Sequence, residues 1–126
     1  MKKELEQLTE GEERIMQALW TLGEGSVNDV LAVLPEPKPK YTTVATFIKL
    51  LGNKGYVTHR AEGKSYIFTP AVPRDEYARK RMRTMLQSYF DGSFSRMVSF
   101  FSKHEDISLQ EMDEIQDLMQ EIRKKQ

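Results

Sequence analysis

The sequence predicts a mainly α-helical protein that carries one small β-hairpin, in two parts at residues 1–72 and 73–126. Three observations lead to this fold class. Apolar residues recur at helical spacing in three segments before Gly55, and a two-residue alternation then flanks a Glu62-Gly63-Lys64 turn. After Arg74 the pattern is helical throughout. A chain of 126 residues has room for one domain, or for one small domain and an appendage.

The first two helices are predicted from their caps. Thr9 followed by Glu12 forms a capping box that opens a helix through about Leu22. Ser26 is placed to cap a second helix that runs to Leu34. Prolines then occupy three alternate positions, so a stiff non-helical loop follows.

The third helix is expected from Tyr41 to Lys54, with Gly55 in the left-handed position past its end. Its buried face is apolar and consists of Val44, Phe47, Ile48 and Leu51. Its other face carries small, hydroxylated or basic residues, namely Thr42, Thr43, Ala45, Thr46 and Lys49. A helix with such a face can lie in a DNA major groove, because short side chains let the backbone approach the base edges. Gly52 costs this helix roughly 1 kcal/mol relative to alanine, and the pattern does not explain it.

The hairpin is expected at residues 56–69, where apolar and polar residues alternate on both sides of the turn. Three helices followed by a hairpin form a winged helix-turn-helix, in which the third helix reads DNA and the hairpin is the wing. Trp20, Tyr66 and Phe68 are expected to be core or half-core aromatics, and His59 a surface residue of a strand. The other interpretation is that the third helix is an ordinary surface helix and the hairpin only closes the core.

The C-terminal part is expected to form helices at about 75–90 and 93–103, and a last helix that Ser108 and Glu111 open with a second capping box and that runs to about Lys125. The last two helices have large apolar faces and too little chain to bury them, so a second copy should cover them. We therefore expect a homodimer whose interface is formed by apolar side chains of these helices. They are Phe94, Met97, Phe100, Phe101, Met112, Ile115, Met119 and Ile122.

The net charge of zero hides a strong pattern along the chain. Residues 1–36 carry 3 basic and 8 acidic side chains, a net −5, whereas residues 37–64 carry 6 and 1, a net +5. Residues 65–103 carry 7 and 3, a net +4, and residues 104–126 carry 3 and 7, a net −4. Local charge is what neutralises phosphates, so the predicted third helix and wing suit DNA. Basic residues that merely solvate surface helices would give the same pattern.

Several classes of function are not supported by the sequence. The chain has no cysteine, which excludes disulfides, thiol catalysis and thiolate metal sites. His59 and His104 do not have metal-site spacing, and the acidic residues at 113–121 suit a solvated helix face. No nucleophile elbow or phosphate-binding loop is present, so neither an enzyme nor a cofactor or metal is expected. The N-terminal stretch MKKELEQLTE lacks the apolar segment of a signal peptide, and a cytoplasmic protein is expected.

Four stretches, in this order and at this spacing, resemble the penicillinase/methicillin-resistance repressor family of BlaI/MecI/CopY-type regulators. They are LTEGEERIMQALW, YTTVATFIKLLGNKGYV, HRAEGKSYIFTPAV and ISLQEMDEIQDLM, and together they span nearly the whole chain. The resemblance implies a homodimeric transcriptional repressor that binds a near-palindromic, inverted-repeat operator. In the antibiotic-resistance branch it also implies inactivation by proteolysis through a membrane sensor-protease pathway.

The resemblance also implies roles for individual residues. Thr42, Thr43, Ala45, Thr46 and Lys49 are the expected base-reading positions, on a recognition helix at 41–54. The wing at 56–69 and the neighbouring cations would contact the DNA backbone. The expected backbone contacts are Lys38, Lys40, Lys54, Arg60 and Lys64.

Three features of the sequence depart from the family pattern. Many relatives have a basic residue where Ala45 stands, so the operator sequence is not carried over. The absence of cysteine removes the copper-sensing motif of one branch. Phe100 replaces the asparagine of the Asn-Phe bond that is cut in the resistance repressors. A winged-helix protein-interaction module with a helical docking tail remains the alternative function.

Overall fold

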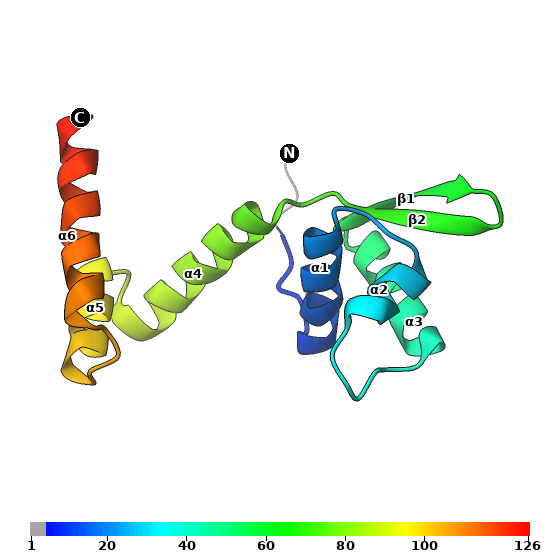
Figure 1. Ribbon diagram of the computed structural model, residues 1–126, viewed down its shortest axis with the longest axis horizontal. Coiled ribbons are helices and arrows are strands. Elements are labelled where there is room, and N and C mark those ends of the chain that lie inside the picture. Colours follow the sequence, from blue (N-terminus) through cyan, green and yellow to red (C-terminus); the bar gives the residue numbers. More distant parts are fainter. Residues whose placement is uncertain (1–4) are drawn as a thin grey trace. The chain divides into compact units, whose positions relative to one another are not determined.

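The computed structural model describes residues 5–126, which form six helices and a two-stranded antiparallel hairpin (Figure 1). The predicted mainly helical fold with a hairpin wing is confirmed. The elements are α1 (Glu10–Leu22), α2 (Val27–Val33), α3 (Tyr41–Asn53), β1 (Val57–Glu62), β2 (Ser65–Pro70), α4 (Arg74–Phe90), α5 (Phe94–Lys103) and α6 (Leu109–Lys124). The first four residues of the stretch that we expected to lack a signal peptide lie outside the described residues.

The internal contacts divide the chain into two compact units, one through Arg81 and one from Met82 onward. The helix α4 contributes residues to both units. A domain division at 72/73 stays a prediction.

Both predicted N-terminal caps are present. At α1, the Glu12 N–H donates to Thr9 Oγ1 at 3.2 Å and the Thr9 N–H donates to Glu12 Oε1 at 2.9 Å. At α2, Ser26 and Asp29 exchange the same pair of bonds at 3.1 and 2.9 Å. The helix α2 ends at Val33, one residue earlier than predicted, because Leu34 has extended backbone angles.

The core of the first unit lies between α1, α2, α3 and the base of the hairpin. Val44, Ile48 and Leu51 of α3 are buried, as their spacing predicts. Phe47 is half-buried and lies directly over Gly11 of α1. A Cβ at Gly11 would lie 2.5 Å from Phe47 Cζ, so a larger residue there would force the Phe47 ring to move.

The hairpin projects from this helical core as a ribbon (Figure 1). Its register pairs Glu62 with Ser65 next to the turn and Val57 with Pro70 at the base. Pro70 is therefore the last residue of β2, one residue beyond the predicted end of the hairpin at residue 69. The Gly25 N–H donates to Phe68 O at 3.0 Å and the Phe68 N–H donates to Gly25 O at 2.8 Å. This pair fixes the α1–α2 loop against β2.

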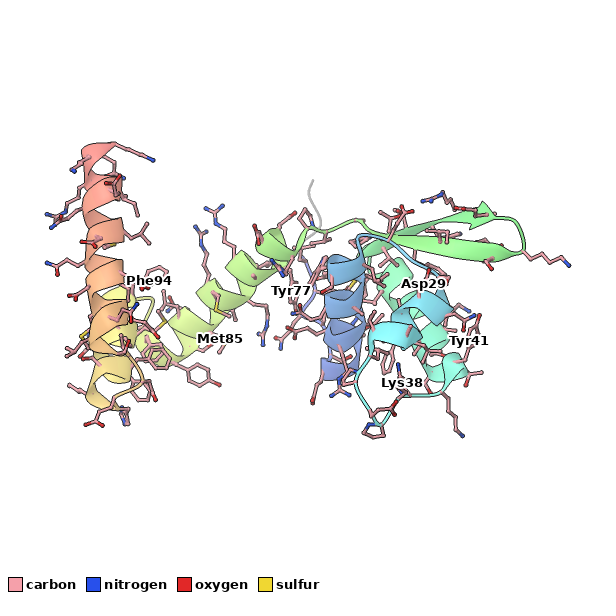
Figure 2. All side chains as sticks on the ribbon, in the orientation of Figure 1. Asp29, Lys38, Tyr41, Tyr77, Met85 and Phe94 are labelled. Atoms are coloured by element: carbon pink, nitrogen blue, oxygen red, sulfur yellow. The ribbon has the colours of Figure 1, made fainter. Side chains whose placement is uncertain are left out.

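The first turns of α4 close the same core. Tyr77 is buried and points into the first unit (Figure 2). The Leu8 N–H donates to Tyr77 Oη at 3.1 Å, and Trp20 Nε1–H donates to Val72 O at 2.8 Å. Burial raises the pKa of the neighbouring Tyr56 hydroxyl to about 12. The Trp20 indole N–H and the Tyr77 hydroxyl oxygen each have a hydrogen-bond partner in the first unit.

The second unit buries little apolar surface in a single chain. The helices α5 and α6 contain no buried residue. Phe90, Phe100 and Phe101 form an aromatic cluster, with ring centroids 5.5 Å apart for Phe90 and Phe100 and 5.7 Å apart for Phe100 and Phe101. No helix among residues 5–126 is long and apolar enough to cross a membrane.

Candidate nucleic-acid interface

Four of the five expected base-reading residues lie together on the exposed face of α3. Thr42, Thr43, Thr46 and Lys49 are all exposed. The Thr46 hydroxyl donates to Thr42 O at 2.9 Å, which leaves its lone pairs as acceptors. Through them Thr46 can accept a hydrogen bond from an exocyclic amine on a base edge.

Ala45, the fifth of these residues, is placed differently from the other four. It is half-buried and packs against the core, because the base of the hairpin and α2 lie next to this side of α3. Its methyl group lines a cleft between α3 and the hairpin. The sequence pattern places Ala45 on the outer face but does not reveal that a neighbouring element covers it.

The N-terminus of α3 lacks a side-chain cap and has no acidic residue in its first turn. The N-cap residue is Lys40. In α1, α2, α5 and α6, by contrast, a threonine or serine hydroxyl accepts a bond from the first turn. The backbone N–H groups at the start of α3 can therefore be offered to an anion.

Lys54 has an internal partner, which argues against its expected contact with DNA. Its Nζ lies 2.7 Å from Oε1 of Glu12, a carboxylate that is only 2% exposed. Burial by itself would raise the pKa of Glu12, but the hydrogen bonds from Lys54 and Thr9 outweigh it and hold the pKa below its usual value. The Lys54 ammonium thus neutralises a buried carboxylate of α1.

Lys38 is also occupied. Its Nζ donates to the carbonyls of Leu31 and Ala32 at 2.7 and 3.0 Å, at the C-terminal end of α2. A lysine at this position satisfies orphan carbonyls and complements the helix dipole. Figure 2 shows Lys38 in the loop that follows α2. Its structural task is to hold the proline-rich loop against that helix.

Arg60 of the wing is held by two carboxylates. Its guanidinium donates to both oxygens of Glu24 at 3.0 and 2.8 Å, and to Glu62 Oε2 at 3.2 Å. The bonds from Arg60 lower the pKa of Glu24, so the carboxylate stays ionised. One cation and two anions sum to a net −1, which makes this group a poor partner for phosphate as it stands.

Three of the cations expected to contact DNA have no partner within the described part of the chain. The ammonium groups of Lys40, Lys49 and Lys64 make no hydrogen bond or ion pair with any residue that the structure describes. They lie before α3, on α3 and at the turn of the wing. Of the five expected backbone cations, only Lys40 and Lys64 are therefore positioned to meet a polyanion, together with the base-reading Lys49.

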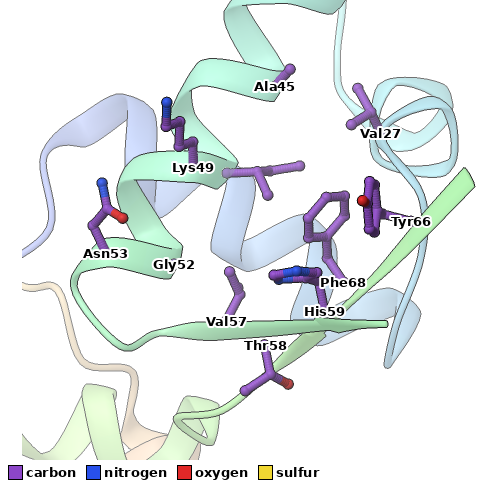
Figure 3. Close-up of a pocket in the computed structure, with 11 residues that line it drawn as sticks. Val27, Ala45, Lys49, Gly52, Asn53, Val57, Thr58, His59, Tyr66 and Phe68 are labelled. Atoms are coloured by element: carbon purple, nitrogen blue, oxygen red, sulfur yellow. The ribbon is translucent and has the colours of Figure 1, made fainter. Parts of the chain in front are cut away.

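The cleft between α3 and the hairpin, here called the α3–wing cleft, has a volume of about 610 Å³ (Figure 3). Eleven residues line it: Val27, Ala45, Ile48, Lys49, Gly52, Asn53, Val57, Thr58, His59, Tyr66 and Phe68. Tyr66 was expected to be core or half-core, but the structure leaves 55% of it exposed. Its register places it beside the turn, where its ring lines this open cleft instead of packing in the core.

The eight residues expected to hold a dimer lie on α5 and α6 of the second unit. Phe94 is 67% exposed and Met119 is 56% exposed. Phe100, Phe101, Ile115 and Ile122 are also exposed, while Met97 and Met112 are half-buried. Among residues 5–126, no group of three or more His, Cys, Asp or Glu side chains is arranged to hold a metal ion.

Comparisons with known proteins cover both units. The sequence profile of the penicillinase repressor family matches residues 8–121. The chain is similar to the penicillinase repressor of Bacillus licheniformis, with 25% identity over 122 residues and 94% of each chain covered. It is 22% identical to the methicillin resistance regulatory protein MecI of Staphylococcus aureus (strain N315), over 90% of this chain and 93% of that one.

Solved structures share the fold of a large part of this chain. Among them is the solution structure of Bacillus licheniformis BlaI, in its monomeric form and in complex with the blaP half-operator. The TM-score is 0.50 at 25% identity, over 60% of this chain and 94% of that chain.

Proposed function

This chain belongs to the penicillinase repressor family, a family of DNA-binding transcriptional repressors and not of enzymes, and we propose that it acts as a homodimer on an inverted-repeat operator. In this proposal α3 enters the major groove and the hairpin lies along the DNA backbone. The observation that carries the proposal is the exposed face of α3, where short hydroxylated side chains and Lys49 stand beside an uncapped helix N-terminus.

Base reading is assigned to Thr42, Thr43, Thr46 and Lys49, with the Ala45 methyl at the edge of the contact. Threonine hydroxyls and methyls can contact either an amine or a thymine methyl, and lysine can donate to guanine. The BlaI relative was solved in complex with a half-operator, which supports DNA binding by this chain.

Backbone contact is assigned to Lys40 and Lys64, whose ammonium groups have no partner in the described part of the chain. The N–H groups at the start of α3 would join them at a phosphate. We leave out Lys38 and Lys54, because both make internal hydrogen bonds that the fold uses.

Dimerisation is assigned to α5 and α6. Their apolar side chains are exposed in one chain, and a second copy related by two-fold symmetry would cover the same patch on both. Two reading helices related in this way require half-sites one helical turn or an integer number of turns apart. The proposed partner is chromosomal DNA, so we place the protein in the cytoplasm.

Release by a membrane sensor-protease is the part of the proposal that rests on the family resemblance alone. Phe100 and Phe101 lie within α5 and contact Phe90, so α5 would have to open before a protease reached that backbone. Mass spectrometry of the protein from induced cells tests this step. Two fragments that meet inside α5 support it, and an intact chain in derepressed cells contradicts it.

A gel shift with the region upstream of the protein's own gene tests the proposed function. At a stated salt concentration, the repressor should shift this duplex and leave a random duplex of equal length unbound. Equal binding to both duplexes would favour the protein-interaction module.

A further inference from the structure

Gly52 lies in the last turn of α3, on the wall of the α3–wing cleft, and internal packing does not require a glycine there. Its φ lies outside the left-handed region, and a Cβ at this position would meet only Val57 Cγ2, at an ordinary 3.9 Å. Alanine would therefore fit and would strengthen the helix. What glycine does at this position is leave the cleft wider.

One wall of the cleft is aromatic (Figure 3). The ring of His59 lies 5.3 Å from that of Tyr66 and 6.2 Å from that of Phe68, measured between centroids. The contact between His59 and Tyr66 is edge to face, with an interplanar angle of 85°. This arrangement leaves ring surface uncovered, and Tyr66 is more than half exposed.

The opposite wall comes from α3 and is polar. It presents Lys49 and Asn53, whose side chains stand on the same side of the helix (Figure 3). The Lys49 ammonium has no partner among the described residues, and the eleven lining residues include no carboxylate. The cleft thus combines an unpaired cation and an amide with an aromatic wall, over an apolar floor that includes Ile48 and Val57.

We infer that the α3–wing cleft binds a small planar aromatic monoanion. The ring of the ligand lies against His59, Tyr66 and Phe68, and its carboxylate pairs with the Lys49 ammonium. The volume of about 610 Å³ falls within the range of small-molecule sites, and such sites join an apolar lining to a few placed polar groups. Aromatic rings gain from offset or edge-to-face contact with other rings.

The effect on DNA binding rests on the proposed function. Lys49 belongs both to the cleft and to the face of α3 that we assign to base reading. A carboxylate held at Lys49 removes that ammonium from the major groove, so ligand and operator compete. By linkage, each then weakens the other by the same factor.

Titration of the full chain with 2-naphthoate in the absence of DNA, followed by amide NMR signals, tests the site. We expect millimolar or tighter binding, with the largest shifts at Gly52, His59 and Phe68. The neutral isostere 2-naphthamide should bind at least about fivefold more weakly, and Lys49→Gln should remove this preference. No binding, or equal binding of acid and amide, overturns the inference.

Gly52→Leu fills the cleft and should weaken 2-naphthoate at least about tenfold. Gly52→Ala, whose Cβ fits at 3.9 Å from Val57, is the milder variant and should weaken the ligand less while raising the melting temperature. Unchanged binding in both variants would mean that the ligand sits elsewhere, which overturns the site.

Adding 2-naphthoate to an operator complex then tests competition. Because the ligand titration contains no DNA, its result stands whether or not the operator is recognised. Release of wild-type protein but not of Gly52→Leu is the expected result. Equal retention of both proteins on the operator at saturating 2-naphthoate would contradict competition.

Discussion

Lys54 Nζ lies 2.7 Å from Glu12 Oε1, and this contact ties the end of α3 to the first turn of α1 across 42 residues of sequence. Glu12 also accepts the Thr9 N–H at 2.9 Å, so one buried carboxylate joins a helix cap to an ion pair. A cation that the charge pattern assigns to DNA therefore has a buried partner within the first unit.

Removing Lys54 should therefore destabilise the protein. Lys54→Ala leaves the buried Glu12 carboxylate without its charge partner, and the free energy of unfolding should fall by about 1–3 kcal/mol. Urea denaturation measures this, with Lys40→Ala as the matched control that should change little. Equal stability of the two variants, with an equal loss of DNA affinity, would instead mean that both lysines contact phosphate.

The same carboxylate should make stability depend on pH in the acid range. The pKa of Glu12 is lower in the folded protein than its ordinary value of 4.5, because hydrogen bonds from Lys54 and Thr9 outweigh the cost of burial. Its contribution is therefore complete above that value and is lost as pH falls through the lower folded pKa. Urea midpoints between pH 6 and pH 3 should fall less steeply for Glu12→Gln. Parallel curves for the two proteins would refute this.

Glu24 should restrain DNA binding through Arg60. Glu24→Gln frees the guanidinium from its bidentate pair, so operator affinity should rise and the salt dependence should steepen by about one unit of slope. Lys64→Ala should do the opposite and flatten the slope by about one unit. Anisotropy titrations over a salt series measure both. If Arg60→Ala flattens the slope as much as Lys64→Ala does, then DNA already displaces Glu24 in the wild-type complex.

The apolar faces of α5 and α6 should hold the dimer. Ile115→Asp places a charge in the proposed interface, and sedimentation equilibrium should give the monomer mass for this variant. Operator affinity should fall with it, because the two half-sites are then bound independently. Gln120→Asp adds the same charge at another exposed position of α6 and should stay dimeric. A dimeric Ile115→Asp would place the interface elsewhere.

Local patterns in the sequence predicted most of the fold. The caps at Thr9 and Ser26, the buried face of α3 and the strand pairing around Gly63 all depend on residues within a few positions of one another. The helix and strand bounds consequently agree to about one residue.

The sequence could not predict what covers each face. Lys54 and Arg60 find their carboxylates 42 and 36 residues away, so no local spacing encodes those pairs. For the same reason, Ala45 is half-buried where an exposed residue was expected, and Tyr66 is exposed where a core or half-core residue was expected. The hairpin base covers the alanine, while the tyrosine, beside the turn, lines the open cleft instead of the core. A reason for glycine at position 52 appears only in the structure, where this residue lines the α3–wing cleft.

Sequence discrimination by α3 is tested most directly by anisotropy titration of the upstream operator and a scrambled duplex, in about 150 mM salt, with wild-type protein and Thr46→Val. Wild type should bind the operator at least about a thousandfold more tightly than the scrambled duplex. Thr46→Val keeps the shape of the side chain but removes the hydroxyl, so it should lose discrimination by about tenfold and bind the scrambled duplex unchanged. Equal affinities of the wild-type protein for both duplexes would contradict a base-reading role for α3.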